Sequence, residues 1–335
     1  AGLGQKDAAV ESYKQAVLLK PDYAIAHYNL GGALLEIGQF DDAVKSYQRA
    51  ITLEPENAEA HNNLGNAHRE LEQLDAAIIC YEKAIVINPN YVEAHYSLGL
   101  TFYDLGKLED TVKSYKQVVA IKPDFAGMHN NLGNVYRELG ELDAALKSYK
   151  KAIAIKPDFV EAFYSLGVIY QEQNLLDDAL KTYEKVISIK PDFAEVHNNL
   201  GTIFSELKQL ENAEESFRQA ILLNPNYAGA HYNLGNTLKD LRKMDEAEES
   251  FRKAIVINPD YAEAHNNLGN IMKSHDRLED AEASFRKAIL INPDYAEAHN
   301  NLGNIMKSHD KLEDAEASFR KAIAIKPDYA QAYSN

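Results

Sequence analysis

The chain has 335 residues, of which 45% are hydrophobic and 26% charged, and its formal net charge is -16. No apolar run approaches the roughly 20 residues that span a membrane, so the sequence predicts no membrane span. The excess of negative charge disfavours nucleic acid and anionic membrane surfaces as partners. The only cysteine, Cys80, excludes an internal disulfide framework.

Proline marks a strict internal repeat. The prolines follow one another at intervals of 34 residues: Pro21, Pro55, Pro89, Pro123, Pro157, Pro191, Pro225, Pro259, Pro293 and Pro327. This period is typical of a solenoid, because one repeat is too small to bury a core and must stack on its neighbours. We therefore expect one elongated domain over residues 1-335, in place of several globular domains.

In chain order, residues 1-23 form a partial repeat, residues 24-329 hold nine complete repeats, and residues 330-335 begin a further one. The complete repeats are 24-57, 58-91, 92-125, 126-159, 160-193, 194-227, 228-261, 262-295 and 296-329. Positions are numbered from 1 to 34 within each complete repeat.

Each repeat predicts two helices with a short break between them. In repeat 262-295 the first helix has an apolar stripe at spacings of three and four: Ala264, His265, Leu268, Ile271 and Met272. The second helix has a similar stripe: Leu278, Ala281, Phe285, Ala288 and Ile289. Asp260 and Glu263 predict a capping box at the start of the first helix. The break lies near residues 274-277, and three repeats have glycine there: Gly38, Gly106 and Gly140.

Several positions are nearly constant. Position 8 is always glycine: Gly31, Gly65, Gly99, Gly133, Gly167, Gly201, Gly235, Gly269 and Gly303. Position 20 is alanine except at Thr111, position 24 is aromatic, and position 27 is alanine except at Val118 and Val186. With these columns, essentially the whole sequence resembles a tetratricopeptide repeat (TPR) array. The resemblance implies an all-α fold, a right-handed α-solenoid or superhelix of stacked antiparallel helix pairs. The glycines let two helices approach closely, and the aromatic residue fills the space between the helices of one repeat.

Histidine occupies position 4, where the family often has tryptophan, in every complete repeat but one: His27, His61, His95, His129, His197, His231, His265 and His299. Successive members lie one repeat apart, about 10 Å, whereas ligands lie about 2 Å from a shared metal ion. We expect half-buried packing residues with a polar tip. No nucleophile motif, phosphate loop or carboxylate pair appears, so we predict neither catalysis nor a cofactor for this chain.

Asparagine recurs on the first helix, beside the apolar stripe. At position 6 it is Asn29, Asn63, Asn131, Asn199, Asn233, Asn267 and Asn301, with Ser97 and Ser165 as interruptions, and Asn335 in the last fragment. At position 9 it is Asn66, Asn134, Asn236, Asn270 and Asn304. Asparagine costs up to about 0.7 kcal/mol relative to alanine in a helix. Because a carboxamide both donates and accepts hydrogen bonds, such a column can bind the backbone of an extended peptide.

The resemblance supports this interpretation, because arrays similar to the O-linked N-acetylglucosamine transferases carry an asparagine ladder in their concave groove that holds peptide backbones. The alternative is that duplication copied a tolerated residue, such as one that bonds between repeats. Position 5 alternates between tyrosine and asparagine over most of the chain. Its tyrosines either offer aromatic pockets at every second repeat or pack as amphipathic residues: Tyr28, Tyr96, Tyr164 and Tyr232.

The sequence therefore predicts a protein-interaction scaffold that binds an extended or helical peptide segment in its concave groove. Two alternatives remain, a substrate-recruiting arm of a larger glycosyltransferase and a self-assembling structural array. Neither end of the sequence has the polar cap of a solenoid, so we also expect head-to-tail self-association. No signal peptide is visible, and the lone cysteine favours a reducing compartment such as the cytoplasm.

Overall fold

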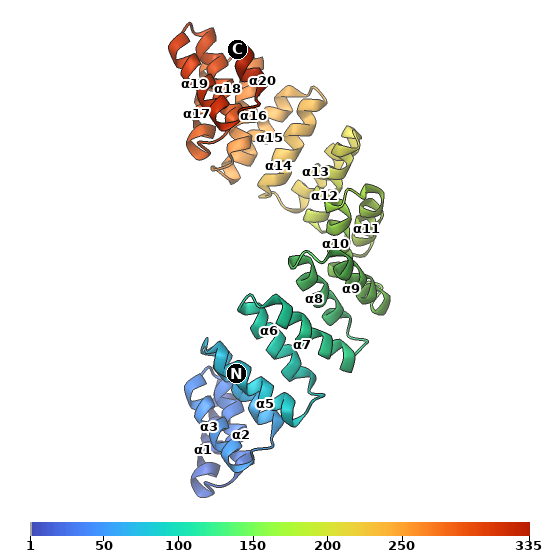
Figure 1. The fold of residues 1–335 in the computed structure, drawn as a ribbon, viewed down its shortest axis with the longest axis vertical. Helices are drawn as coiled ribbons and strands as arrows, with labels where there is room; N and C mark the ends of the chain where they lie inside the picture. The colour runs from blue at the N-terminus through green and yellow to red at the C-terminus, as the bar shows by residue number, and fades with distance from the viewer. Residues whose placement is uncertain (1) are drawn as a thin grey trace. The chain divides into compact units, whose positions relative to one another are not determined.

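The computed structural model describes residues 2-335, so Ala1 of the predicted partial repeat lies outside the described residues. These residues form α-helices and contain no strand (Figure 1). The helices are α1 (Gly2–Leu19), α2 (Ala24–Glu36), α3 (Phe40–Leu53), α4 (Ala58–Glu70), α5 (Leu74–Ile87), α6 (Val92–Asp104), α7 (Leu108–Ile121), α8 (Ala126–Glu138), α9 (Leu142–Ile155), α10 (Val160–Glu172), α11 (Leu176–Ile189), α12 (Ala194–Glu206), α13 (Leu210–Leu223), α14 (Ala228–Asp240), α15 (Met244–Ile257), α16 (Ala262–Ser274), α17 (Leu278–Ile291), α18 (Ala296–Ser308), α19 (Leu312–Ile325) and α20 (Ala330–Ser334).

The chain divides into two compact units, unit 1 (Ala1–Ile169) and unit 2 (Tyr170–Asn335), and the boundary falls near the end of α10. Within each unit, the two helices of a repeat pack against each other, as α6 does on α7 in unit 1 and α14 on α15 in unit 2 (Figure 1). This arrangement confirms the predicted all-α stack of helix pairs. A single array over residues 1-335 stays a prediction.

We call the first helix of a repeat its A helix and the second its B helix. A helices of neighbouring repeats touch one another, α2 with α4 and α4 with α6 in unit 1, and α12 with α14 and α16 with α18 in unit 2. Each of these A helices is followed by a B helix that packs on the A helix of the next repeat, as α3 does on α4. Side chains at positions 5, 6 and 9 of the A helices therefore meet their counterparts from the next repeat.

Glycine at position 8 and the aromatic residue at position 24 form the central contact of the helix pairs that lie within one unit. A Cβ atom added to Gly65 would lie 2.6 Å from the ring of Tyr81, and one added to Gly235 would lie 2.7 Å from Phe251. Both rings are fully buried. Only a residue without a side chain lets the A and B helices come this close, as the sequence predicts.

The break between the two helices places position 15 in the left-handed region of backbone space in every complete repeat. Glycine occupies it where the sequence predicts the turn, with φ between +69° and +76°: Gly38, Gly106 and Gly140. Other repeats put a residue with a side chain there: Glu72, Asn174, Lys208, Arg242, Asp276 and Asp310. The turn is thus common to all repeats, although glycine marks it in only three.

The expected capping box at the start of α16 is wrong. The N-cap residue is Tyr261, and no side chain caps the helix. Asp260 lies inside the preceding turn, where its N–H donates to Asn258 Oδ1 at 3.2 Å. Because asparagine before the proline closes this turn through its own side chain, Asp260 does not reach the helix start.

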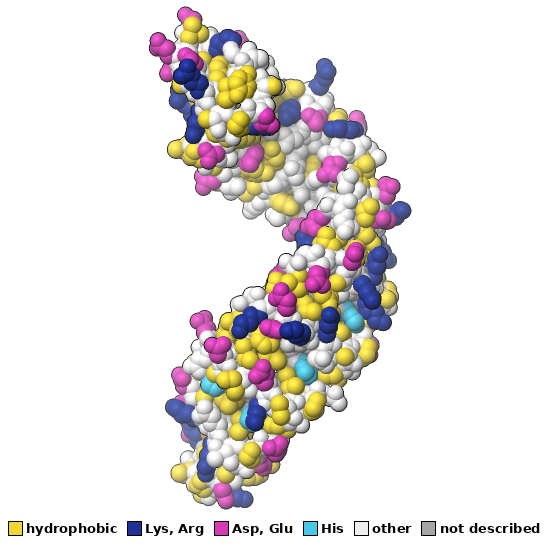
Figure 2. Space-filling model, in the orientation of Figure 1, with side chains coloured by type: hydrophobic (Ala, Val, Ile, Leu, Met, Phe, Trp, Pro, Cys, Tyr) yellow, Lys and Arg dark blue, Asp and Glu magenta, His cyan; other side chains and the backbone are white. Residues whose placement is uncertain are grey.

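No helix within residues 2-335 is both long and apolar enough to cross a membrane. On the face shown in Figure 2, acidic and basic side chains are interspersed with hydrophobic ones.

Candidate functional site

The position 6 asparagines all lie on A helices and are half-buried: Asn29, Asn63, Asn131, Asn199, Asn233, Asn267 and Asn301. A side chain that is half-buried typically lies at the border of a packed interface. These carboxamides therefore contact protein on one side and are accessible on the other. We call positions 5, 6 and 9 of the A helices the amide face of their unit.

In unit 2 the position 6 carboxamide reaches back to position 5 of the preceding repeat. Asn233 Nδ2 donates to Asn198 Oδ1 at 3.1 Å, and Asn301 Nδ2 donates to Asn266 Oδ1 at 3.0 Å. Asn335 makes the same bond to Asn300 at 3.0 Å. Asparagine side chains thus join successive repeats, which is the structural role that the sequence left open as the alternative.

Where position 5 is tyrosine, its hydroxyl takes the place of the carboxamide oxygen as the partner of the position 6 Nδ2. Asn63 Nδ2 donates to the Tyr28 hydroxyl at 3.0 Å, and Asn267 Nδ2 lies 3.4 Å from the Tyr232 hydroxyl. The Tyr28 hydroxyl also lies 3.5 Å from Glu59, and burial with this carboxylate raises the pKa of Tyr28. These two tyrosines therefore join repeats through their hydroxyls as well as through their rings.

The predicted tyrosines differ in their surroundings. Tyr96 on α6 is 36% exposed, and its ring stacks on Tyr115 with centroids 6.0 Å apart. Tyr232 on α14 packs against Tyr261 at 4.8 Å. Tyr164 on α10 is half-buried. Of the four predicted tyrosines, Tyr96 presents the most open aromatic surface on the amide face.

The position 9 asparagines fall into two groups. Asn66 and Asn134 accept hydrogen bonds at 2.9 and 2.8 Å from the position 24 tyrosine of their own repeat, and Asn236 accepts one from Asn267 at 2.8 Å. Asn270 and Asn304 are half-buried, and their carboxamides make no hydrogen bond within residues 2-335. These last two are free to bond to a ligand.

The position 5 asparagines are also members of this site. They are the most buried amides of the face: Asn62, Asn130, Asn198, Asn266 and Asn300. The alternation of tyrosine and asparagine at position 5 was the available signal. Its meaning depends on a bond to a residue 35 positions further along the chain, which one repeat alone does not reveal.

The histidine column has a structural role that agrees with the packing expectation. Each ring is buried or half-buried, and its Nε2 lies 2.9 to 3.1 Å from the carbonyl oxygen of the proline six residues before it, as in His95 and His231. Burial lowers the pKa of His231 and of His265 from the ordinary value of 6.5. The ring fastens the proline turn to the A helix. Within residues 2-335 no cluster of metal-ligating side chains occurs.

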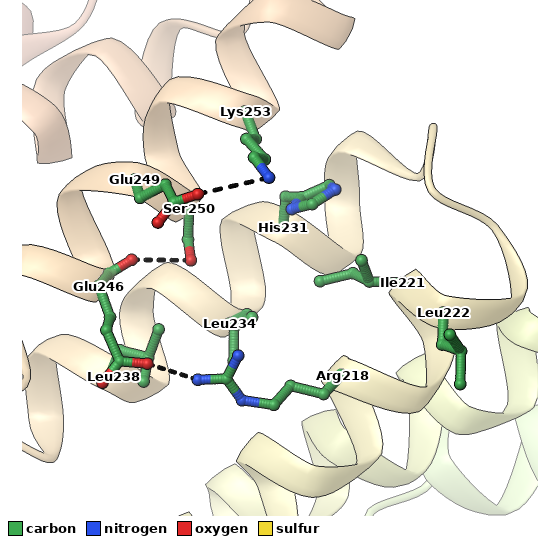
Figure 3. A pocket seen from close by; sticks show the side chains of 10 residues that line it. All are labelled: Arg218, Ile221, Leu222, His231, Leu234, Leu238, Glu246, Glu249, Ser250 and Lys253. Carbon is green, nitrogen blue, oxygen red and sulfur yellow. Dashed lines mark hydrogen bonds and ion pairs between the residues drawn. The ribbon is translucent and has the colours of Figure 1, made fainter.

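A second surface feature lies away from the amide face. A cavity of about 310 Å³ lies in unit 2 between α13, α14 and α15. Ile221, Leu222 and Leu234 are among its lining residues (Figure 3). The Arg218 guanidinium donates to Glu246 at 2.6 Å across it (Figure 3). This ion pair joins two B helices and occupies the polar side of the cavity, so the cavity is a weaker candidate for a peptide site than the amide face.

Comparison with known proteins places these features in a family. Profiles described as "TPR repeat" and "Tetratricopeptide repeat" match overlapping segments of the chain: 3–38, 31–71, 65–106, 99–137, 133–174, 169–208, 194–227, 228–261, 250–283, 274–310 and 296–329. No curated protein sequence matches the chain at significant similarity.

Solved structures show the same fold. PilF of Pseudomonas aeruginosa is 20% identical with a TM-score of 0.57, over 62% of this chain and 95% of that one. The Cut9 and Hcn1 hetero-tetramer structure of APC/C includes a chain that is 15% identical with a TM-score of 0.55, over 97% of this chain and 80% of that one. A tetratricopeptide repeat protein from Parabacteroides merdae is 21% identical with a TM-score of 0.55, over 72% of this chain and 96% of that one. Since the profile matches run without interruption from residue 3 to residue 329, the chain belongs to the tetratricopeptide repeat family.

Proposed function

We propose that this chain is a protein-interaction scaffold that binds an extended segment of a partner protein along the amide face. The observation that carries the proposal is that the position 6 carboxamides use only part of their hydrogen-bonding capacity within the chain. Asn233 and Asn301 donate from Nδ2 to the preceding repeat, and their Oδ1 atoms accept no hydrogen bond within the described chain. Carboxamides fixed on one side and unsatisfied on the other are prearranged for a ligand.

The spacing of the carboxamides suits an extended chain. Neighbouring A helices lie about 10 Å apart, and an extended peptide advances about 3.3 Å per residue. One repeat therefore corresponds to about three ligand residues, so each carboxamide would accept from one backbone N–H in three. Because every peptide residue except proline carries this N–H, the contact favours extended segments and depends little on their side chains.

The test uses asparagines that have no structural bond. Replacing Asn270 and Asn304 with alanine should keep or raise the melting temperature, because alanine is the better helix former by up to about 0.7 kcal/mol per site. The same change should weaken binding of a peptide selected on the wild-type protein from a randomised phage-displayed library, measured by fluorescence polarisation.

The matched control is Asn301→Ala, which removes a bond between repeats and should lower both stability and binding. Unchanged peptide affinity in the Asn270 and Asn304 double variant, or selected peptides that do not compete for one site, would reject the amide face as the binding surface.

A further inference from the structure

Two buried carboxamides in unit 1 hold an acceptor atom without a donor. Asn62 on α4 and Asn130 on α8 are only 4% and 7% exposed. The Oδ1 atom of each is buried and accepts no hydrogen bond from the described part of the chain. A buried acceptor without a donor destabilises a fold, because the hydrogen bond that water supplies in the unfolded chain is not replaced. An added donor would therefore bind favourably at these two atoms.

The pattern of hydrogen bonds between position 5 and position 6 explains why these two Oδ1 atoms lack a donor. In unit 2, a position 5 asparagine receives its hydrogen bond from the position 6 asparagine of the next repeat, as Asn198 does from Asn233. In unit 1 the residues at the two donor places are Ser97 and Ser165. Serine ends at its hydroxyl, so the carboxamide that completes the ladder elsewhere is missing. Both interruptions of the asparagine column thus coincide with an unpartnered acceptor.

The other polar groups around Asn62 already have partners. Asn62 Nδ2 donates to Asn63 Oδ1 at 3.4 Å, and Asn63 Nδ2 donates to the Tyr28 hydroxyl at 3.0 Å. Tyr96 directly precedes Ser97 on α6 and is 36% exposed. The free acceptor is thus the unsatisfied polar group at this place, and it suits a ligand group that has an N–H to donate.

We propose that the two gaps, Ser97 opposite Asn62 and Ser165 opposite Asn130, are subsites for carboxamide side chains, asparagine or glutamine, of the bound peptide. The inference rests on the proposed function of the amide face. The ligand N–H donates to Oδ1 of the position 5 asparagine, which turns about its soft terminal torsion to meet it. A carboxylate in the same place has no N–H to donate, so the subsites select glutamine over glutamate.

The two subsites lie two repeats apart, and both lie in unit 1. Two repeats measure roughly 20 Å, which an extended peptide covers in about six residues. A ligand that uses both subsites therefore carries two carboxamide side chains about six residues apart. This separation gives the otherwise sequence-tolerant amide face a preference for particular segments.

The experiment compares two fluorescein-labelled peptides made of glycine and serine, one with two glutamines at this separation and one with two glutamates. The wild-type protein should bind the glutamine peptide at least tenfold more tightly. The double variant Ser97→Asn with Ser165→Asn supplies the missing donors from the chain itself. It should melt at a higher temperature and lose the preference for glutamine. The control Ser97→Ala with Ser165→Ala leaves the gaps open and should keep the preference.

Equal affinity for the two peptides, or a preference that survives Ser97→Asn with Ser165→Asn, would overturn the subsites. The proposed function is tested separately by the library-selected peptides. If these lose affinity in the Asn270 and Asn304 variant and keep it in the Ser97→Asn and Ser165→Asn variant, the amide face binds peptide without these subsites. A higher melting temperature with no change in peptide preference would mean that the two gaps are packing defects only.

Discussion

At the scale of single residues, two adjacent glycines in α2 differ in what a methyl group would meet. A Cβ atom on Gly31 would lie 2.8 Å from the buried ring of Tyr47, whereas one on Gly32 would lie 3.6 Å from the hydroxyl of that ring. We expect Gly31→Ala to destabilise the protein by about 1–3 kcal/mol through overpacking. Gly32→Ala should stabilise it by up to about 1 kcal/mol, because alanine is the better helix former. Urea unfolding measures both, and equal effects would contradict the packing role of position 8.

The histidine column predicts a dependence of stability on pH. Burial lowers the pKa of His231 and of His265 below 6.5, so the unfolded chain binds protons more readily than the folded chain. Their contribution is complete above pH 6.5 and is lost as the pH falls from there through the folded pKa. The melting temperature should therefore fall as the pH is lowered from about 6.5 through the folded pKa of these two histidines. His231→Gln with His265→Gln should flatten this slope, and an unchanged slope would assign it to other groups.

At the scale of the helix pair, the sequence predicts the helices and the close contact of Gly65 with Tyr81 because these features repeat at a fixed period. It does not predict how α16 begins. Asp260 and Glu263 have the spacing of a capping box, but Asn258 uses its side chain to close the proline turn, which leaves Tyr261 at the N-cap. Three residue types compete for one short turn, and their spacing alone does not decide among them.

The turn between the A and B helices offers a stabilising change. Lys208 and Arg242 have φ of 60° and 63°, a conformation that costs a residue with a Cβ atom about 1–2 kcal/mol. Replacing both with glycine should stabilise unit 2 by up to about 1 kcal/mol per site, after the greater flexibility of glycine in the unfolded chain is subtracted. The reverse change Gly140→Ala, at φ 75° with open space around it, should destabilise unit 1. Melting temperatures of the wild-type protein, the double glycine variant and Gly140→Ala test both expectations.

At the scale of the whole molecule, the sequence predicts the family, the fold and which column carries polar side chains. It leaves open whether these side chains bind a ligand or bond to one another. The bond from Asn301 to Asn266 joins residues on two helices whose relative rotation follows from packing, and periodicity holds no information on that rotation. For the same reason the buried acceptors of Asn62 and Asn130 become visible only when the helices are placed side by side.

The amide register also limits how the chain can lengthen by duplication. In unit 2, repeats 262-295 and 296-329 differ at three positions, and each receives the same bond at position 5, to Asn266 and to Asn300. A copied single repeat would meet a matching neighbour on both sides. In unit 1, tyrosine and asparagine alternate at position 5. One inserted repeat would therefore place two tyrosines or two asparagines in neighbouring repeats. The array can therefore grow or shrink by 34 residues at a time at repeats 262-295 and 296-329, whereas unit 1 keeps its pairing only in steps of two repeats.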